Sequence, residues 1–130
     1  MNLNHLGLGV TEVPRTVAMF EKYFGLRRVD RSPANDKMGF VNDDSGALIT
    51  IFRVPDVNYP KIFHIGFMQD SVEQVHSLHE QLSADGFQPE AMREEHGRQT
   101  FYFQAPGGFT IEVNAFITED TAARARSTAD

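Results

Sequence analysis

An order of one strand, one helix and three strands occurs twice along this chain of 130 residues. This internal repeat constrains the fold more than any single motif does. Residues 4–10 and 63–68 both predict a short strand that carries the sequence His-x-Gly, with His5 and His64 in matching places. The chain is therefore expected to be α+β, with two tandem βαβββ modules.

The first module is predicted to span about residues 2–53. Thr11 is expected to cap its helix, which has apolar residues at helical spacing, and Gly25 is expected to end it. The later elements are predicted as strands at 27–30, 38–42 and 47–53, a polar loop at 31–36, and a turn that ends at Gly46.

A linker at 54–61, rich in Pro, Asp and Asn, precedes the second module at about 62–116. Ser71 is expected to cap its helix and Asp85-Gly86 to close it. We expect one domain, 1–130, with a polar tail at 117–130 that can extend a helix. The strands of this module are predicted at 87–89 (a weak one), 100–104 and 109–114, with a charged loop at 92–98.

Composition excludes several partners. The formal net charge of −6 argues against nucleic acid or an anionic membrane, because phosphate neutralisation needs clustered Lys and Arg. The chain has no Cys, no charged apolar leader and no apolar run long enough to cross a bilayer. We therefore expect a cytoplasmic protein without disulfides.

The last predicted strand contains a carboxylate that needs an explanation. It follows the turn Pro106-Gly107-Gly108, and its alternation places Glu112 on the polar face, opposite the apolar residues 109, 111 and 113. Strands disfavour Glu, and burial of its charge is costly. Either the Glu112 side chain faces solvent or a partner such as a metal ion stabilises it. By the same alternation, His5 and His64 also lie on the polar faces of their strands.

The repeat, with its two His and one Glu, resembles the vicinal oxygen chelate superfamily over residues 2–116. That group includes glyoxalases, bleomycin-resistance proteins, fosfomycin-resistance enzymes and extradiol dioxygenases. The resemblance implies that the modules curl into a half-open barrel around a divalent metal and that the protein is a homodimer. It also implies His5, His64 and Glu112 as metal ligands. Thr50 takes the fourth position, where enzymes of the glyoxalase I type have an acidic or amide ligand.

The chemistry of these residues supports the same metal independently. Two neutral imidazoles and one carboxylate suit Fe²⁺, Mn²⁺, Ni²⁺, Zn²⁺ or Co²⁺ and leave coordination positions open for a substrate or water. Glycines next along the strands, at positions 7, 9 and 66, would leave room for a ligand.

Strand alternation also predicts a substrate pocket that is partly apolar and carries no Lys or Arg, since Arg53 falls on the opposite face. Such a pocket suits a small, partly apolar molecule that chelates a metal through oxygen, and suits a phosphonate or glutathione poorly. The predicted lining residues are Met38, Phe40, Leu48, Thr50, Phe52, Met68, Thr100, Gln104 and Asn114.

Tyr102 is the predicted catalytic partner of Glu112, ten positions earlier on the neighbouring strand. Its hydroxyl could point at a metal-bound oxygen, a placement that resembles the one in extradiol dioxygenases and fosfomycin-resistance enzymes. The alternative is that Tyr102 is simply a half-buried aromatic residue of the strand. The resemblance to ring-cleaving enzymes would also imply a His that acts as an acid–base shortly before the second metal ligand. Residues 49–61 contain no His. His96 could supply a proton, and His76 and His79 are expected on a wet helical face.

We therefore expect a metal-dependent enzyme for a small-molecule substrate, with extradiol-dioxygenase-like chemistry as the first expectation. A glyoxalase-like lyase or isomerase is the alternative. A metal-free binding protein of the bleomycin-resistance type would use the same pocket without turnover.

Overall fold

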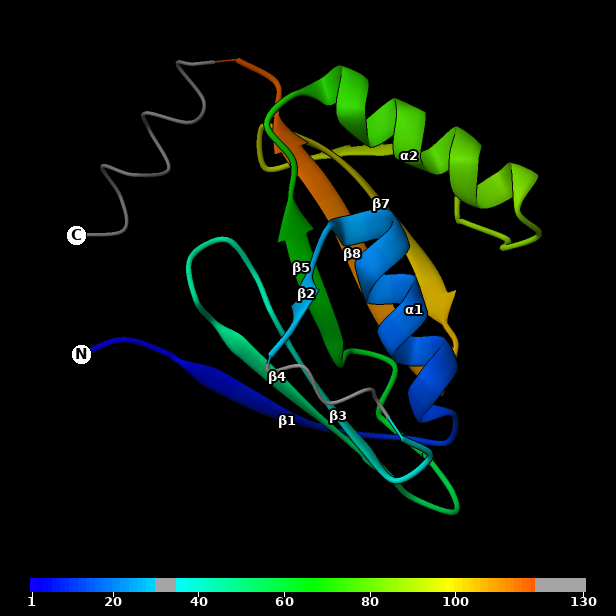
Figure 1. Cartoon of the computed structure of the whole chain (residues 1–130). Coiled ribbons are helices and arrows are strands. Elements are labelled where there is room, and N and C mark those ends of the chain that lie inside the picture. Colours follow the sequence, from blue (N-terminus) through cyan, green and yellow to red (C-terminus); the bar gives the residue numbers. More distant parts are fainter. Residues whose placement is uncertain (30–34, 119–130) are drawn as a thin grey trace. The chain divides into compact units, whose positions relative to one another are not determined.

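The computed structural model describes residues 1–29 and 35–118 of the chain (Figure 1). Contacts within the chain divide it into two compact units. The first is Met1–Phe63 with Ala105–Phe109, and the second is His64–Gln104 with the described residues from Thr110 onward. Most of the polar loop expected at 31–36 and nearly all of the tail expected at 117–130 lie outside the described residues.

The sheet of the first unit has the strand order β1-β4-β3-β2. β1 runs parallel to β4, and β3 runs antiparallel to both of its neighbours, β4 and β2. A helix that follows β1 allows this parallel pairing, because parallel neighbours need a crossover connection. The elements of this unit are β1 (His5–Val10), α1 (Val13–Phe24), β2 (Arg27–Arg28), β3 (Met38–Asn42) and β4 (Leu48–Arg53).

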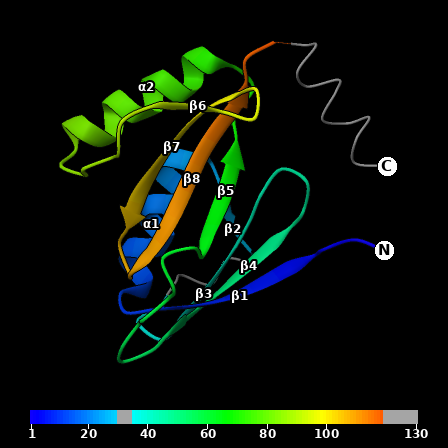
Figure 2. The same ribbon diagram turned by 180° about the vertical axis from the view of Figure 1, so that it is seen from behind.

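The second sheet repeats the topology, with the order β5-β8-β7-β6. β5 runs parallel to β8, and the view from behind shows β8 between β5 and β7 (Figure 2). The predicted βαβββ repeat is therefore confirmed. Its elements are β5 (His64–Met68), α2 (Val72–Ala84), β6 (Arg93–Glu95), β7 (Arg98–Ala105) and β8 (Phe109–Phe116).

Strand register confirms the correspondence between Thr50 and Glu112. In the first sheet Gly7 pairs with Thr50. In the second sheet Gly66 pairs with Glu112. Each pair joins the glycine two residues after the repeated His to the matching position of the last strand, so the two modules share one backbone plan.

Most of the buried strand residues are those that the alternating patterns predict; Thr100 and Asn114, predicted to line the pocket, are also buried. On β8, Phe109, Ile111 and Val113 are at most 1% exposed, and Leu8 and Val10 on β1 are fully buried. Their removal from water is the main favourable contribution to folding. The helices bury most of the expected stripes, namely Val13, Val17 and Phe20 on α1 and Val75, Leu78 and Leu82 on α2. Phe24 and Val72, also expected in these stripes, are half-buried.

Three of the four predicted helix ends are correct. Gly25 ends α1 in the left-handed conformation at φ 66°, and Ser71 caps α2 by accepting a hydrogen bond from the Gln74 amide. Gly86, at φ 94°, follows the C-cap of α2. The prediction of Thr11 as the cap of α1 is wrong. Glu12 takes that position without a side-chain cap.

The strand assignment around residues 87–98 is also corrected. The weak strand predicted at 87–89 does not form; Phe87 instead packs edge-on against Phe103, with ring centres 5.7 Å apart. The charged segment predicted as a loop contains β6, which pairs antiparallel with β7. The reason is a two-residue hairpin loop, since His96 at φ 53° and Gly97 at φ 73° have the positive φ that such turns need.

Within residues 1–29 and 35–118, none of the helices has the length and apolar composition needed to span a membrane.

The Pro-Gly-Gly turn belongs to the first unit and leaves no space for a side chain at Gly107. Gly107 has φ 95°, and its carbonyl accepts a hydrogen bond from the Thr11 amide at 3.2 Å. A Cβ there would lie 2.7 Å from the hydroxyl oxygen of Thr16 and 2.8 Å from Cβ of Val10. Thr16 cannot move cheaply, because it is fully buried and its hydroxyl donates to the carbonyl of Pro106 at 3.0 Å.

We predict that Gly107→Ala lowers the free energy of unfolding by about 2–4 kcal/mol, the sum of a positive-φ penalty and overpacking. Gly46→Ala is the matched control, since Gly46 has φ 90° but nothing within 4 Å of the added Cβ. The control should lose only about 1 kcal/mol. Chemical denaturation of both variants tests this, and equal losses would contradict the close contact at Gly107.

Candidate functional site

The second unit places two predicted metal ligands on neighbouring strands. His64 begins β5 and is exposed, whereas Glu112 lies half-buried on β8. His64 pairs with Thr110 and Gly66 pairs with Glu112, so the His64 and Glu112 side chains share one face, one pleat apart. A Cβ on Gly66 would lie 3.3 Å from Oε2 of Glu112, so this glycine leaves the space that the carboxylate occupies.

Both oxygens of the Glu112 carboxylate accept a hydrogen bond. The Tyr102 hydroxyl donates to Oε1 at 2.7 Å, and Nδ2 of Asn114 donates to Oε2 at 2.8 Å. These charge-assisted bonds explain how a carboxylate is stabilised in the middle of a β-strand. Alternation put Asn114 on the correct face, but sequence reasoning missed its bond to Glu112.

Tyr102 is held on several sides. The ring centres of His64 and Tyr102 lie 5.6 Å apart, with the ring planes at 85°. The bond to Glu112, together with desolvation, raises the pKa of Tyr102 from 10.0 to about 12. Tyr102 is therefore a neutral phenol near pH 7, which makes it a hydrogen-bond donor and not a base.

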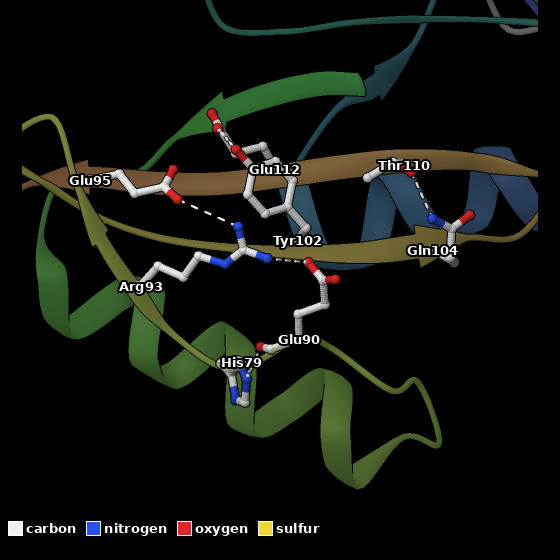
Figure 3. A network of polar contacts seen from close by, with 8 residues as sticks. All are labelled: His79, Glu90, Arg93, Glu95, Tyr102, Gln104, Thr110 and Glu112. Carbon is white, nitrogen blue, oxygen red and sulfur yellow. Dashed lines mark hydrogen bonds and ion pairs between the residues drawn. The ribbon is translucent and has the colours of Figure 1, made fainter. Parts of the chain in front are cut away.

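A guanidinium covers the other side of Tyr102 (Figure 3). Cζ of Arg93 lies 5.4 Å from the Tyr102 ring centre, in the range of a cation–π contact. Glu90 and Glu95 each contact Arg93 at 3.4 Å. Arg93 thus stands in a network of opposite charges beside the hydroxyl that meets Glu112.

The expectation that no Arg lies on these faces is therefore wrong. Arg93 pairs with Thr100 across β6 and β7, so its side chain shares the face of Tyr102. In the first sheet Arg27 pairs with Asn42, which puts Arg27 on the face of the predicted lining residues there. In both cases the unexpected arginine lies on a short outer strand, β2 for Arg27 and β6 for Arg93.

The first unit carries the remaining predicted ligand, His5. It is exposed on β1, and its Nδ1 lies 2.7 Å from Oδ1 of Asn4. Thr50, the counterpart of Glu112, is half-buried and donates from its hydroxyl to the Leu6 carbonyl at 3.3 Å. The first unit therefore presents a hydroxyl where the second presents a carboxylate.

Among the predicted lining residues most apolar side chains are exposed, whereas the polar ones range from buried to exposed. In the first unit Leu48 is half-buried. Thr100 and Asn114, in the second unit, are only 2% and 4% exposed, and Gln104 donates to the Thr110 hydroxyl at 2.6 Å. The exposed apolar residues are Met38 (38%), Phe40 (37%) and Phe52 (40%) in the first unit and Met68 (62%) in the second.

Other histidines have structural surroundings. Nε2 of His79 lies 2.9 Å from the Glu90 carbonyl, and its ring packs edge-on against Phe101 at 4.9 Å. His79 is therefore half-buried and keeps part of the expected wet face, and His76 is exposed as expected. His96 lies in the tight turn between β6 and β7.

The donor chemistry of the second unit fits a divalent cation in part. An imidazole and a carboxylate on one strand face are ligands for borderline metals such as Fe²⁺ or Zn²⁺. Within residues 1–29 and 35–118, no three His, Asp or Glu side chains gather into a metal-binding group. His64 and Glu112 supply two donors, so a further ligand is needed to complete a site.

Comparison with known proteins places these features in context. A family model described as Glyoxalase/Bleomycin resistance protein/Dioxygenase superfamily matches residues 2–113. A solved structure of a possible glyoxalase from Bacillus cereus is 40% identical and has a TM-score of 0.80, covering 87% of this chain and 97% of that one. The fosfomycin resistance protein FosX from Listeria monocytogenes, solved with Mn(II) and sulfate, has a TM-score of 0.76 over 95% of this chain and 97% of its own. At 22% identity, it shows a shared fold.

A curated relative is the probable trivalent organoarsenical cleaving enzyme of Bacillus subtilis, 28% identical over 87 residues, or 67% of this chain. The match covers 58% of that protein and 52% of a second organoarsenical cleaving enzyme, from a Bacillus species. The chain therefore spans little more than half the length of the curated relatives it matches.

We predict that an alkaline titration followed at 295 nm shows one of the three tyrosines ionising late, near pH 12. Tyr102→Phe should remove this late phase, and Glu112→Gln should move it toward pH 10, because the acceptor charge is gone. Since the folded-state pKa is raised, the stability it contributes is present below pH 10 and is lost as pH rises through about 12. Loss of an early phase in Tyr102→Phe would contradict the bond to Glu112.

Proposed function

Because the chain belongs to the Glyoxalase/Bleomycin resistance protein/Dioxygenase superfamily, we propose that it is a divalent-metal-dependent enzyme for a small substrate that chelates the metal through oxygen. The observation that carries the proposal is the Glu112 carboxylate, held at both oxygens on the strand face that also presents His64. Such a carboxylate is ready to bind a cation without reorganising.

The proposed ligands are His5, His64 and Glu112, with Fe²⁺, Mn²⁺, Ni²⁺, Zn²⁺ or Co²⁺ as the metal. The Mn(II) in the FosX structure supports a divalent ion in this fold. A bound ion of this kind supplies Lewis-acid polarisation of a substrate oxygen. His64 and Glu112 share one face of the second sheet, and His5 is the proposed third ligand.

Tyr102 has a separate proposed role. Its hydroxyl is neutral at physiological pH, so by turning its one O–H from Glu112 toward a substrate oxygen it would stabilise developing negative charge there. The His64 edge contact and the Arg93 guanidinium restrain the ring, which fixes the direction of that donor.

The first sheet supports a substrate with an apolar body. Phe40 pairs with Thr50, and Met38 pairs with Phe52, so these exposed side chains form one continuous face with His5. A flat apolar surface of this kind suits an aromatic ring. Arg27 and Arg93 are each paired with carboxylates, so a substrate without an anionic group still suits these faces best.

Oxygen-dependent cleavage of a catechol-like ring is the reaction that the apolar face favours. Glyoxalase-like lyase or isomerase chemistry is the second candidate, favoured by the 40% identity to a possible glyoxalase. Cleavage of trivalent organoarsenicals has less support, because soft centres prefer thiolate ligands and none of the 130 residues is Cys.

We predict that purified wild-type protein binds one equivalent of Fe²⁺ or Mn²⁺ and that His64→Ala and Glu112→Ala each abolish this binding. Each substitution removes a proposed ligand. Calorimetric titration measures the affinity, and the rise in melting temperature on adding metal gives a second readout. The control is His76→Ala, which removes an exposed His of α2 and should bind as wild type does. Wild-type protein that neither binds nor is stabilised by metal would favour the metal-free binding protein.

We predict that protein loaded with Fe²⁺ consumes oxygen with catechols and that Tyr102→Phe lowers the rate by about 10²-fold or more, as expected for loss of one donor to an oxyanion. An oxygen electrode measures the reaction. Turnover of methylglyoxal with a thiol, in place of oxygen uptake, would assign the lyase or isomerase reaction instead.

A further inference from the structure

We propose that Asn114 is a positioning residue that orients the Glu112 carboxylate for metal binding. This inference rests on the proposed function, because it gives Glu112 the role of a metal ligand. It assigns Asn114 to the support of Glu112 and not to contact with substrate.

The contact itself has a simple origin in the strand. Residues two apart on a strand point to the same face, so the Asn114 amide lies beside the Glu112 carboxylate on β8. Nδ2 of Asn114 donates to Oε2 at 2.8 Å, while Tyr102 donates to Oε1 from β7. Two donors on opposite sides fix the rotation of the carboxylate about its last bond.

The rest of the Asn114 side chain is poorly placed for stability. Asn114 is 4% exposed, and its Oδ1 is buried without a hydrogen-bond partner in the described part of the chain. Rotating the amide would not relieve this, because Oδ1 would then face Oε2, and two acceptors repel. A buried acceptor without a donor destabilises the folded state, and Asn is also disfavoured in strands.

These two observations point to the same role. A residue chosen for packing alone at this position would be apolar, because Asn114 is only 4% exposed. What Asn114 supplies that an apolar residue cannot is the N–H donor to Glu112. A carboxylate offers about four acceptor sites, so its two hydrogen bonds leave about two for a cation. Groups that orient a metal ligand in this way commonly change affinity 10–100-fold when removed.

The test is Asn114→Leu, which keeps the size of the side chain and removes both the donor and the unpaired acceptor. We expect the affinity for Mn²⁺ to fall roughly 10–100-fold. The melting temperature of the metal-free variant shows that it is folded; this value combines two opposing effects, the loss of the unpaired oxygen and the loss of the donor to Glu112. Titration calorimetry and thermal melting provide the two readouts, and neither depends on enzyme activity.

Thr110→Val is the matched control. Thr110 flanks Glu112 on the other side of the same strand face, but its hydroxyl accepts from Gln104 and makes no bond to Glu112. Its loss should leave the Mn²⁺ affinity at the wild-type value. Where Asn114→Leu fails to fold, Asn114→Ala, which cannot clash, replaces it in the metal titration.

The outcomes separate the two proposals. Wild-type protein that binds no Mn²⁺ overturns the proposed function. Wild-type protein that binds Mn²⁺ no more tightly than Asn114→Leu overturns the role of Asn114 alone. Reduced affinity of folded Asn114→Leu, with the affinity of Thr110→Val unchanged, supports the inference. Equal reductions in both variants would overturn it, because the loss would then not depend on the bond to Glu112.

Discussion

The chemistry of the second unit depends on how the carboxylate of Glu112 is stabilised on a β-strand. A half-buried charge there needs partners, and Tyr102 and Asn114 supply one donor for each oxygen. The absence of a side chain at Gly66 gives the carboxylate its space. Because Tyr102 donates a hydrogen bond to this carboxylate, the pKa of Tyr102 rises and its hydroxyl stays a donor. The position of one anion thereby decides the roles of its neighbours.

The repeat shows how two modules with one backbone plan acquire different chemistry. Gly7 faces Thr50 in the first sheet, as Gly66 faces Glu112 in the second. The small, uncharged hydroxyl of Thr50 donates a hydrogen bond to the Leu6 carbonyl and needs no further donors. The first sheet can therefore present apolar side chains around His5. The second sheet must surround its carboxylate with polar groups. The difference between the two modules in proposed metal ligands therefore follows from one position, which is Thr50 in the first module and Glu112 in the second.

Sequence periodicity predicted most of the fold because the apolar residues of most strands alternate with polar ones. The order of elements, the strand faces and the equivalence of Thr50 and Glu112 were all predicted from it. The predictions fail where the local sequence pattern is too short, or too easily overridden by distant contacts, to determine the structure. Arg93 and its neighbours read as a charged loop, because a three-residue strand has no measurable period, and only pairing with β7 orders it. Thr11 is a good cap by residue type, but its amide is held by Gly107, which is far away in the sequence.

By itself, the sequence determined the α+β repeat and placed Tyr102, Glu112, His64 and His5 on the polar faces of their strands, since alternation is a local property of the chain. Only the tertiary structure decided which groups meet. The bonds of Tyr102 and Asn114 to Glu112, the Arg93 guanidinium over Tyr102 and the unpaired Oδ1 of Asn114 depend on strand register and side-chain rotamers. These are set by packing across the sheet, between residues whose separation in sequence carries no signal of their contact.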